Sequence, residues 1–314
     1  MLRGATKTFF TDSSLGNSAS TTEATTLLSF DSDGFTVGSN NGVNSSGDAK
    51  LAWQWKAGDS NTAVSASGSG DGYINACTHR ANQTAGFSLV KYTGANSQIS
   101  NGQDTKVTHG LGAKPELAFI KNMDDTHDWR VLSTSTTGFA SDSQTGDDAH
   151  LTLNSNAIIN GSLFTGHFET GSDSTHFEVG NDNSVNKNGN EFMAFLFRSI
   201  PGYCKVTSYE GNGNANGPFV DLGFKASWIL FKRYTGSTAS WAIYDKARDP
   251  FNAAENMMLV ESTAGDNVGN KVDILSNGVK IRGTSGAYNG SGNEYLVLAF
   301  AEHPFAGTTP ITAR

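Results

Sequence analysis

Histidines are the side chains of this chain that could most readily hold a metal or move a proton, and they are scattered. No two of the seven stand two or four residues apart, the spacings that would direct both at one metal ion. His109, in the stretch VTHGLG, is the most suggestive, but the equivalent position of a later repeat is Val220. We interpret His109 as a turn or strand-end histidine and not as a catalytic base. The sequence predicts no metal site and no cofactor. The seven histidines are His79, His109, His127, His150, His167, His176 and His303.

Two acidic pairs, Asp124–Asp125 and Asp147–Asp148, are the candidates for hydrolytic chemistry. A glycosidase needs two carboxylates that face each other across a cleft, and adjacent acids in polar loops do not indicate that arrangement. The loop Gly211–Gly217 has one residue too many for a dinucleotide-binding fingerprint and leads into another strand. The chain has no nucleophile elbow, P-loop or HExxH motif. We therefore expect no enzymatic activity.

Aromatic side chains could instead bind sugars by stacking. Trp129 and Trp241 recur at equivalent places within apolar strands, which predicts that both belong to the core. Tyr234 and Tyr288 stand in loops rich in Gly, Ser and Asn. These two tyrosines are the candidate ligand-binding residues.

The element that must position any such residue is a repeated apolar run. Glu191–Phe197 reads EFMAFLF and Glu294–Phe300 reads EYLVLAF, 103 residues later. A fainter copy lies at Gly47–Gly58, where Trp53 and Trp55 stand 142 residues before Phe195 and Phe197. Such runs are too short and too aromatic for helices, so each predicts a strand buried on both faces. Repetition at this length indicates a duplicated module.

The composition agrees with many short strands joined by polar turns, because Gly is 36 of 314 residues and Pro only 6. We expect an all-β fold of tandem antiparallel β-sandwich modules, jelly-roll-like in form. The expected units are a partial first module at 1–58, a linker at 59–85, a second module at 86–202, a third module at 203–306 and a C-terminal tail at 307–314.

The first copy is incomplete, since nothing in the chain matches Tyr203–Asp245 ahead of it. Our hypothesis is that another subunit or a neighbouring module completes it, or that the gene starts late. The two cysteines, Cys77 and Cys204, are expected to be buried thiols, and their pairing stays open.

A net charge of −8 argues against nucleic acid and against an anionic membrane surface as partners. No apolar stretch has the length of a signal peptide or of a membrane span, so we expect a soluble protein without membrane insertion.

Taken together, the stretches GFSLVKYTG, VTHGLGAKPELAFIKN, SYEGNGNANGPFVDLGFKASWILFKR and LSNGVKIRG resemble a family of repeat-containing structural proteins of tailed, especially marine, bacteriophages. The resemblance runs from Arg3 to Arg314. It implies a virion component without enzymatic activity, such as part of a tail fibre or appendage. Expected partners are other virion proteins, further copies of the chain in a homotrimer, and a host surface glycan. The alternatives are a carbohydrate-binding module, a capsid decoration protein and a polysaccharide depolymerase.

Overall fold

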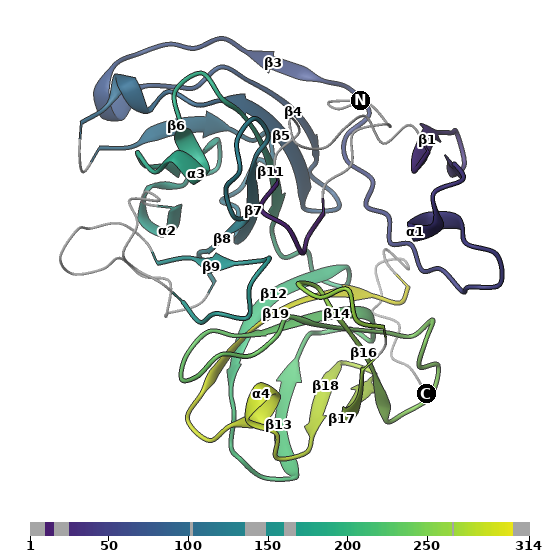
Figure 1. Cartoon of the computed structure of the whole chain (residues 1–314). Helices are drawn as coiled ribbons and strands as arrows, with labels where there is room; N and C mark the ends of the chain where they lie inside the picture. The colour runs from purple at the N-terminus through teal and green to yellow at the C-terminus, as the bar shows by residue number, and fades with distance from the viewer. Residues whose placement is uncertain are drawn as a thin grey trace.

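A computed structural model describes residues 10–15, 25–100, 103–135, 149–159, 168–265 and 267–303. Most of their regular secondary structure is antiparallel β-strand, so the all-β, sandwich-like expectation is confirmed (Figure 1). Figure 1 shows three lobes, which carry β1 and α1, β4 to β11, and β12 to β19. The tail expected at 307–314 lies outside the described residues.

The second module is a seven-stranded sheet of order β3-β4-β5-β11-β7-β8-β9, and the pair β10-β6 packs over one face of it around a common core. Its strands are β3 (Thr62–Val64), β4 (Cys77–Asn82), β5 (Phe87–Thr93), β6 (Thr105–Thr108), β7 (Leu117–Asn122), β8 (Arg130–Ser133), β9 (Leu151–Thr152), β10 (His176–Val179) and β11 (Glu191–Phe197). Its short helices are η1 (Gly70–Gly72), η2 (Asn96–Gln98), α2 (Phe168–Gly171) and α3 (Asn183–Asn186).

The third module is an eight-stranded sheet of order β12-β19-β14-β15-β16-β17-β18-β13, and all eight strands contribute side chains to one enclosed core. Its elements are β12 (Cys204–Glu210), β13 (Asn216–Asp221), β14 (Ala226–Arg233), β15 (Ala242–Asp245), β16 (Ala254–Leu259), β17 (Asn267–Leu275), β18 (Gly278–Arg282), α4 (Gly286–Asn289) and β19 (Glu294–Ala301).

The repeated apolar runs are the central strands of these modules. β11 pairs with β5 and β7, and β19 pairs with β12 and β14, so the two copies have equivalent neighbours. Along β11, Phe192 and Leu196 enter the core of the second module, whereas Phe197 enters a different core. In β19, Val297 enters the core of the third module, and Phe300 enters the same core as Phe197. The prediction of a strand buried on both faces is confirmed for both copies.

The first copy departs from this pattern. It has the hairpin β1 (Leu27–Phe30) and β2 (Phe35–Val37) and the helix α1 (Asn41–Asn44), but residues 48–58 have no regular secondary structure and pair with no strand of the described residues. The prediction of a third buried strand is therefore wrong for these residues. Trp53 and Trp55 pack against a core, whereas Ala52 and Gln54 on the opposite face are exposed. No strand of the described residues covers that face.

The segment expected to be a linker, 59–85, belongs to the second module. β3 and β4 lie within it, and β4 pairs with β5 along its whole length. The sequence hides this strand because Cys77 and His79 are its most buried residues, and the remainder of CTHRAN has no apolar side chain larger than that of alanine.

A glycine-containing hairpin recurs in the first and third copies. The dipeptide Asn–Gly is typical of the centre of a type I′ hairpin turn, but Asn277–Gly278 does not occupy that centre. Leu275 pairs with Gly278, so Ser276 and Asn277 form the turn. Gly278 is required for another reason. A Cβ there would lie 2.2 Å from the carbonyl oxygen of Val220 on the neighbouring strand.

Ahead of each copy of the repeated run stands a one-turn helix with the same polar contacts. Its last residue is Asn44, Asn186 or Asn289, and each of these side chains donates from Nδ2 to the glycine carbonyl six residues earlier, over 2.9, 2.7 and 2.8 Å. Three residues after each asparagine comes a glycine with φ of 83°, 77° or 71°, which favours glycine because a Cβ is strained there. The repeat is thus structural in all three copies.

Candidate functional site at the junction of the three modules

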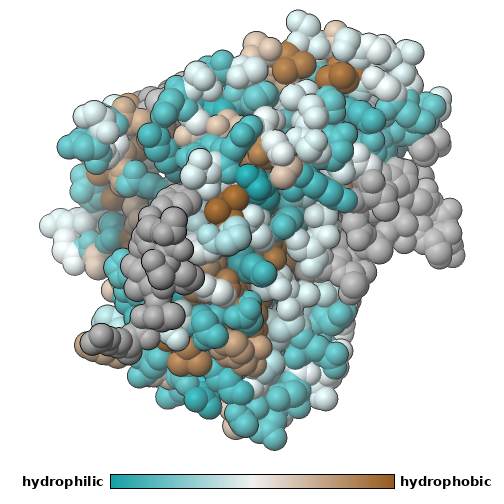
Figure 2. All heavy atoms as spheres, turned by 180° about the vertical axis from the view of Figure 1, so that it is seen from behind, coloured by the Kyte–Doolittle hydropathy of each residue, from teal (hydrophilic) through white to brown (hydrophobic). Residues whose placement is uncertain are grey.

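The second and third modules face each other across a shared apolar core. One side of it comes from β5, β7, β8 and β11, and the other from β12, β14, β15 and β19. Figure 2 shows that hydrophilic side chains dominate the face of the molecule behind Figure 1, with smaller apolar groups among them. The main apolar area between the modules is therefore buried at their junction and not displayed on that face.

Equivalent aromatic residues of all three copies meet in this core. Trp55, Phe197 and Phe300 occupy the same position of the repeated run, at offsets of 142 and 103 residues. Their ring centroids are 6.4 Å (Trp55–Phe197), 5.9 Å (Phe197–Phe300) and 5.7 Å (Trp55–Phe300) apart. The equivalent rings of the three copies are thus in mutual contact around one line, which we call the junction axis.

The second module holds a loop of the first copy by two buried side chains. Trp129 donates from Nε1 to the carbonyl oxygen of Phe10 over 3.0 Å. Lys121 donates from Nζ to the carbonyl oxygen of Ser14 over 2.9 Å. Both donors are almost fully buried, so these bonds fix where the loop of the first copy lies.

The third module holds the second in the same way. Trp241 donates from Nε1 to the carbonyl oxygen of Thr152 over 3.0 Å, and Lys232 donates from Nζ to that of Asn156 over 3.0 Å. Thr152 and Asn156 lie 142 residues after Phe10 and Ser14, the offset that relates the first two copies of the repeated run. One interface thus occurs twice in the chain. We call the bound segments loop 1 (Phe10–Leu15) and loop 2 (Thr152–Ala157).

A third segment has the same local form, and we call it loop 3 (Leu259–Ala264). In each loop a serine side chain accepts a bond from the amide two residues later. The pairs are Leu15 N to Ser13 Oγ at 3.2 Å, Ala157 N to Ser155 Oγ at 3.1 Å and Ala264 N to Ser262 Oγ at 3.1 Å. Loop 1 also contacts loop 3 directly, because Thr11 Oγ1 donates to the carbonyl oxygen of Val260 over 3.0 Å.

The two buried lysines serve structure by donating to carbonyl oxygens. Besides loop 1, Lys121 Nζ donates to the carbonyls of Asn122 and His127 over 2.9 and 2.8 Å. Lys232 Nζ donates to Ala239 O over 2.5 Å and lies 5.7 Å from the ring centroid of Trp241. Burial lowers the pKa of both lysines to about 8, so both remain mainly protonated at neutral pH.

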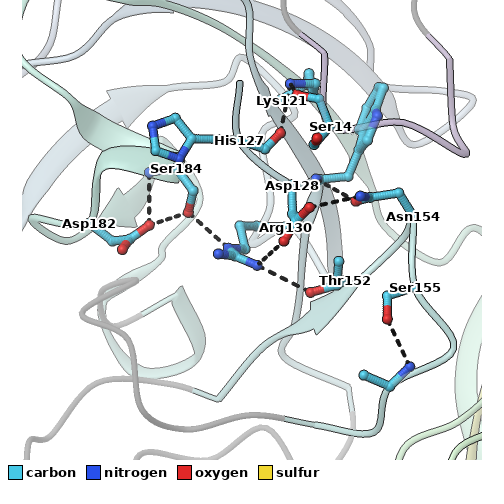
Figure 3. A network of polar contacts seen from close by, with 12 residues as sticks. Ser14, Lys121, His127, Asp128, Arg130, Thr152, Asn154, Ser155, Asp182 and Ser184 are labelled. Carbon is cyan, nitrogen blue, oxygen red and sulfur yellow. Dashed lines mark hydrogen bonds and ion pairs between the residues drawn. The ribbon is translucent and has the colours of Figure 1, made fainter. Parts of the chain in front are cut away.

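Charged groups beside Lys121 form a network that joins β8, β9 and α3 (Figure 3). Arg130 donates to Ser184 Oγ over 2.8 Å and to Thr152 Oγ1 over 3.1 Å. Asn154 of loop 2 donates to Asp128 over 2.8 Å. This network holds Thr152 and Asn154 of loop 2 by their side chains and so helps to position the Thr152 carbonyl that Trp241 binds.

A cavity of about 920 Å³ opens beside the shared core. Its lining is mainly apolar and includes Phe30, Trp53 and Trp228, together with Val260 of loop 3. Three buried nitrogen atoms of lining residues have no hydrogen-bond partner among the described residues, namely Trp53 Nε1, Trp228 Nε1 and Arg80 Nε. These three atoms are themselves buried and are not exposed in the cavity wall, which is mainly apolar.

The two tyrosines predicted to contact ligand are buried. Tyr234 is 0% exposed and belongs to the shared core, and Tyr288 is 5% exposed and belongs to the core of the third module. Neither offers an exposed ring for stacking, so this prediction is wrong. The flanking Gly, Ser and Asn residues form an exposed bend after Tyr234 and the one-turn helix α4 at Tyr288, but both tyrosine side chains pack into a core. The core positions expected of Trp129 and Trp241 are confirmed by exposures of 3% and 0%.

The other chemistry-bearing residues are used individually. No group of three or more His, Cys, Asp or Glu residues in the described part of the chain could hold a metal. Burial lowers the pKa of His109 to about 4, and its Nδ1 accepts a bond from the amide of Leu111 over 3.0 Å. Cys77 and Cys204 are free thiols, and burial raises their pKa values to about 11 and about 12.

Of the acidic pairs, Asp124 accepts a bond from the amide of Glu191 over 2.6 Å, and Asp125 pairs with Lys187. Asp147, Asp148 and His167 lie outside the described residues.

Among the helices of the described residues, none has both the length and the apolar character needed to cross a membrane.

The fold and junction define an all-β protein in which copies of one sandwich-like module surround a common apolar core. The chain belongs to the family described as a domain of unknown function, DUF7483, whose model matches residues 1–304. No curated protein and no solved structure matches it.

Proposed function

We propose that this chain is a non-enzymatic structural protein of a tailed-bacteriophage virion, a component of a tail fibre or appendage. The observation that carries the proposal is the repeated junction, in which buried Lys and Trp side chains of one module bind the loop of the module before it. Lysine and tryptophan side chains, which in other proteins bind ligands or take part in catalysis, hold adjacent modules together here. Such a rigid arrangement suits a protein that bears load within an assembly.

Within this proposal, the partners are other virion proteins and further copies of the chain in a homotrimer, with a host surface glycan as the external contact. The carbohydrate-binding alternative loses its two candidate residues, because Tyr234 and Tyr288 are buried. The depolymerase alternative has one described acidic pair, and both of its members already bind groups of the chain.

Quantitative mass spectrometry of density-purified phage particles tests the proposal. We expect peptides of this chain in a fixed ratio to the major capsid protein, with host ribosomal proteins as the control for contamination. A few copies per particle would indicate a tail component, and hundreds would indicate capsid decoration instead. Abundance in the lysate without recovery in the particles would contradict a virion role.

A further inference from the structure

Loop 3 has the form of loops 1 and 2 but lacks their contacts. Loops 1 and 2 are each bound by a buried lysine and a buried tryptophan of the following module. Among the described residues, no lysine or tryptophan side chain is hydrogen-bonded to Leu259–Ala264, and residues 262–264 are exposed. The bond from Thr11 Oγ1 to the carbonyl oxygen of Val260 places loop 3 next to the first copy.

The part of the first copy beside loop 3 includes a segment that pairs with no strand that the structure describes. We call the region formed by loop 3, residues 47–58 and the hairpin β1–β2 the open sector. β11 and β19 each lie between two neighbouring strands, whereas the equivalent residues 47–58 pair with no strand of the described chain. An extended segment with open backbone groups is a template for strand addition. Trp53 and Trp55 already anchor this segment to the shared core, so an added strand would meet a fixed partner.

The hairpin β1–β2 has exposed apolar residues at positions whose counterparts in the third module are buried. Leu28 is 44% exposed and Phe30 is 56% exposed. By the register of the two hairpins, Phe30 corresponds to Ile274, which is 5% exposed. In the third module, residues of β12 to β15 complete the core around Ile274. The first copy therefore presents half of a core.

The cavity of about 920 Å³ lies between these features, since its lining includes Phe30, Trp53 and Val260. The cavity wall is mainly apolar, which suits the apolar side chains of an added strand. The open sector thus has an apolar wall and, in loop 3, backbone acceptors for a lysine and a tryptophan.

We propose that this sector binds a β-segment of a second polypeptide that has the chemistry of Tyr203–Asp245. Its defining features are an apolar strand that ends in lysine and a tryptophan nine residues later, as in Lys232 and Trp241. The strand pairs with residues 47–58 and covers the apolar face of β1–β2. Its lysine and tryptophan bind the carbonyls of loop 3, which repeats the established interface a third time. This inference does not depend on the virion role.

A surrogate segment tests the proposal in the full chain. Residues 203–248 are added ahead of Met1 through a Gly/Ser linker of about 15 residues. We expect amide hydrogen exchange to slow about tenfold or more in residues 47–58 and 259–264. In a matched fusion, the added copies of Lys232 and Trp241 are both changed to Ala, and we expect exchange in loop 3 to remain fast.

Unchanged exchange in both segments overturns the proposal, whether or not the added residues fold. Equal protection by the two fusions also overturns it, because the lysine and tryptophan would then have no role. A third measurement follows the unmodified chain as its concentration rises. Protection of 259–264 in that series would assign the sector to a second copy of the whole chain and would contradict the proposed partner.

Discussion

Replacing Trp241 with Phe removes one hydrogen-bond donor from the junction and keeps an aromatic ring in place. The indole Nε1 donates to the carbonyl oxygen of Thr152 over 3.0 Å, and the side chain is fully buried. Leaving a buried carbonyl without its donor costs about 1–3 kcal/mol. The smaller ring loses about 1 kcal/mol of apolar burial. We therefore expect the free energy of unfolding to fall by about 2–4 kcal/mol.

Urea unfolding measures this loss as a lower midpoint with an unchanged slope. Hydrogen exchange then shows where the loss occurs. The amides of Ala239 and Ile159 donate across the junction to Asn156 O and Tyr234 O, over 3.0 and 3.2 Å. Both amides should exchange faster in Trp241→Phe, because the bond that positions loop 2 is gone.

Trp129→Phe is the matched variant, since Trp129 donates to the carbonyl of Phe10 over 3.0 Å in the equivalent place. It should cost a similar free energy of unfolding and speed exchange in loop 1, while Ala239 and Ile159 remain protected. The reasoning is refuted if Trp241→Phe leaves these two amides unchanged, or if Trp129→Phe speeds them equally.

The remaining predictions concern buried histidines and the asparagines of the one-turn helices. Burial lowers the pKa of His109 and of His150 from 6.5 to about 4, so the folded chain favours the neutral rings. Their contribution to stability is complete above pH 6.5 and is lost as the pH falls towards about 4, by about 3 kcal/mol for each ring. Urea unfolding across this range measures the loss, and a flat profile would contradict it. Asn186→Ala and Asn289→Ala should each lower the free energy of unfolding by about 2–3 kcal/mol, because both side chains are buried and hydrogen-bonded. Asn44→Ala removes the same bond at an exposed site and should cost less than about 1 kcal/mol; thermal or urea unfolding of the three variants compares them, and equal losses would contradict the argument from burial.

The duplicated strands could be predicted from sequence because their apolar runs and their spacing repeat together. The offsets of Lys121 to Lys232 and of Trp129 to Trp241 were visible as well, but a sequence does not reveal that a lysine inside a sheet donates to a loop from another module. That contact depends on how the modules surround the axis.

Local composition misled the predictions in two places. Tyr234 and Tyr288 have loop-like neighbours, and composition indicates a turn without indicating what packs over it. The strand Cys77–Asn82 escaped prediction because it is stabilised by pairing with β5 more than by apolar side chains of its own.

Coupling among Trp55, Phe197 and Phe300 tests the central claim, that three copies of one module meet at a common axis. Double-mutant cycles with Ala at each pair, followed by urea unfolding, measure the three pairwise energies. We expect coupling of about 0.5–1.5 kcal/mol for every pair, since each pair of rings is in contact. Additive losses in both pairs that include Trp55 would contradict the claim.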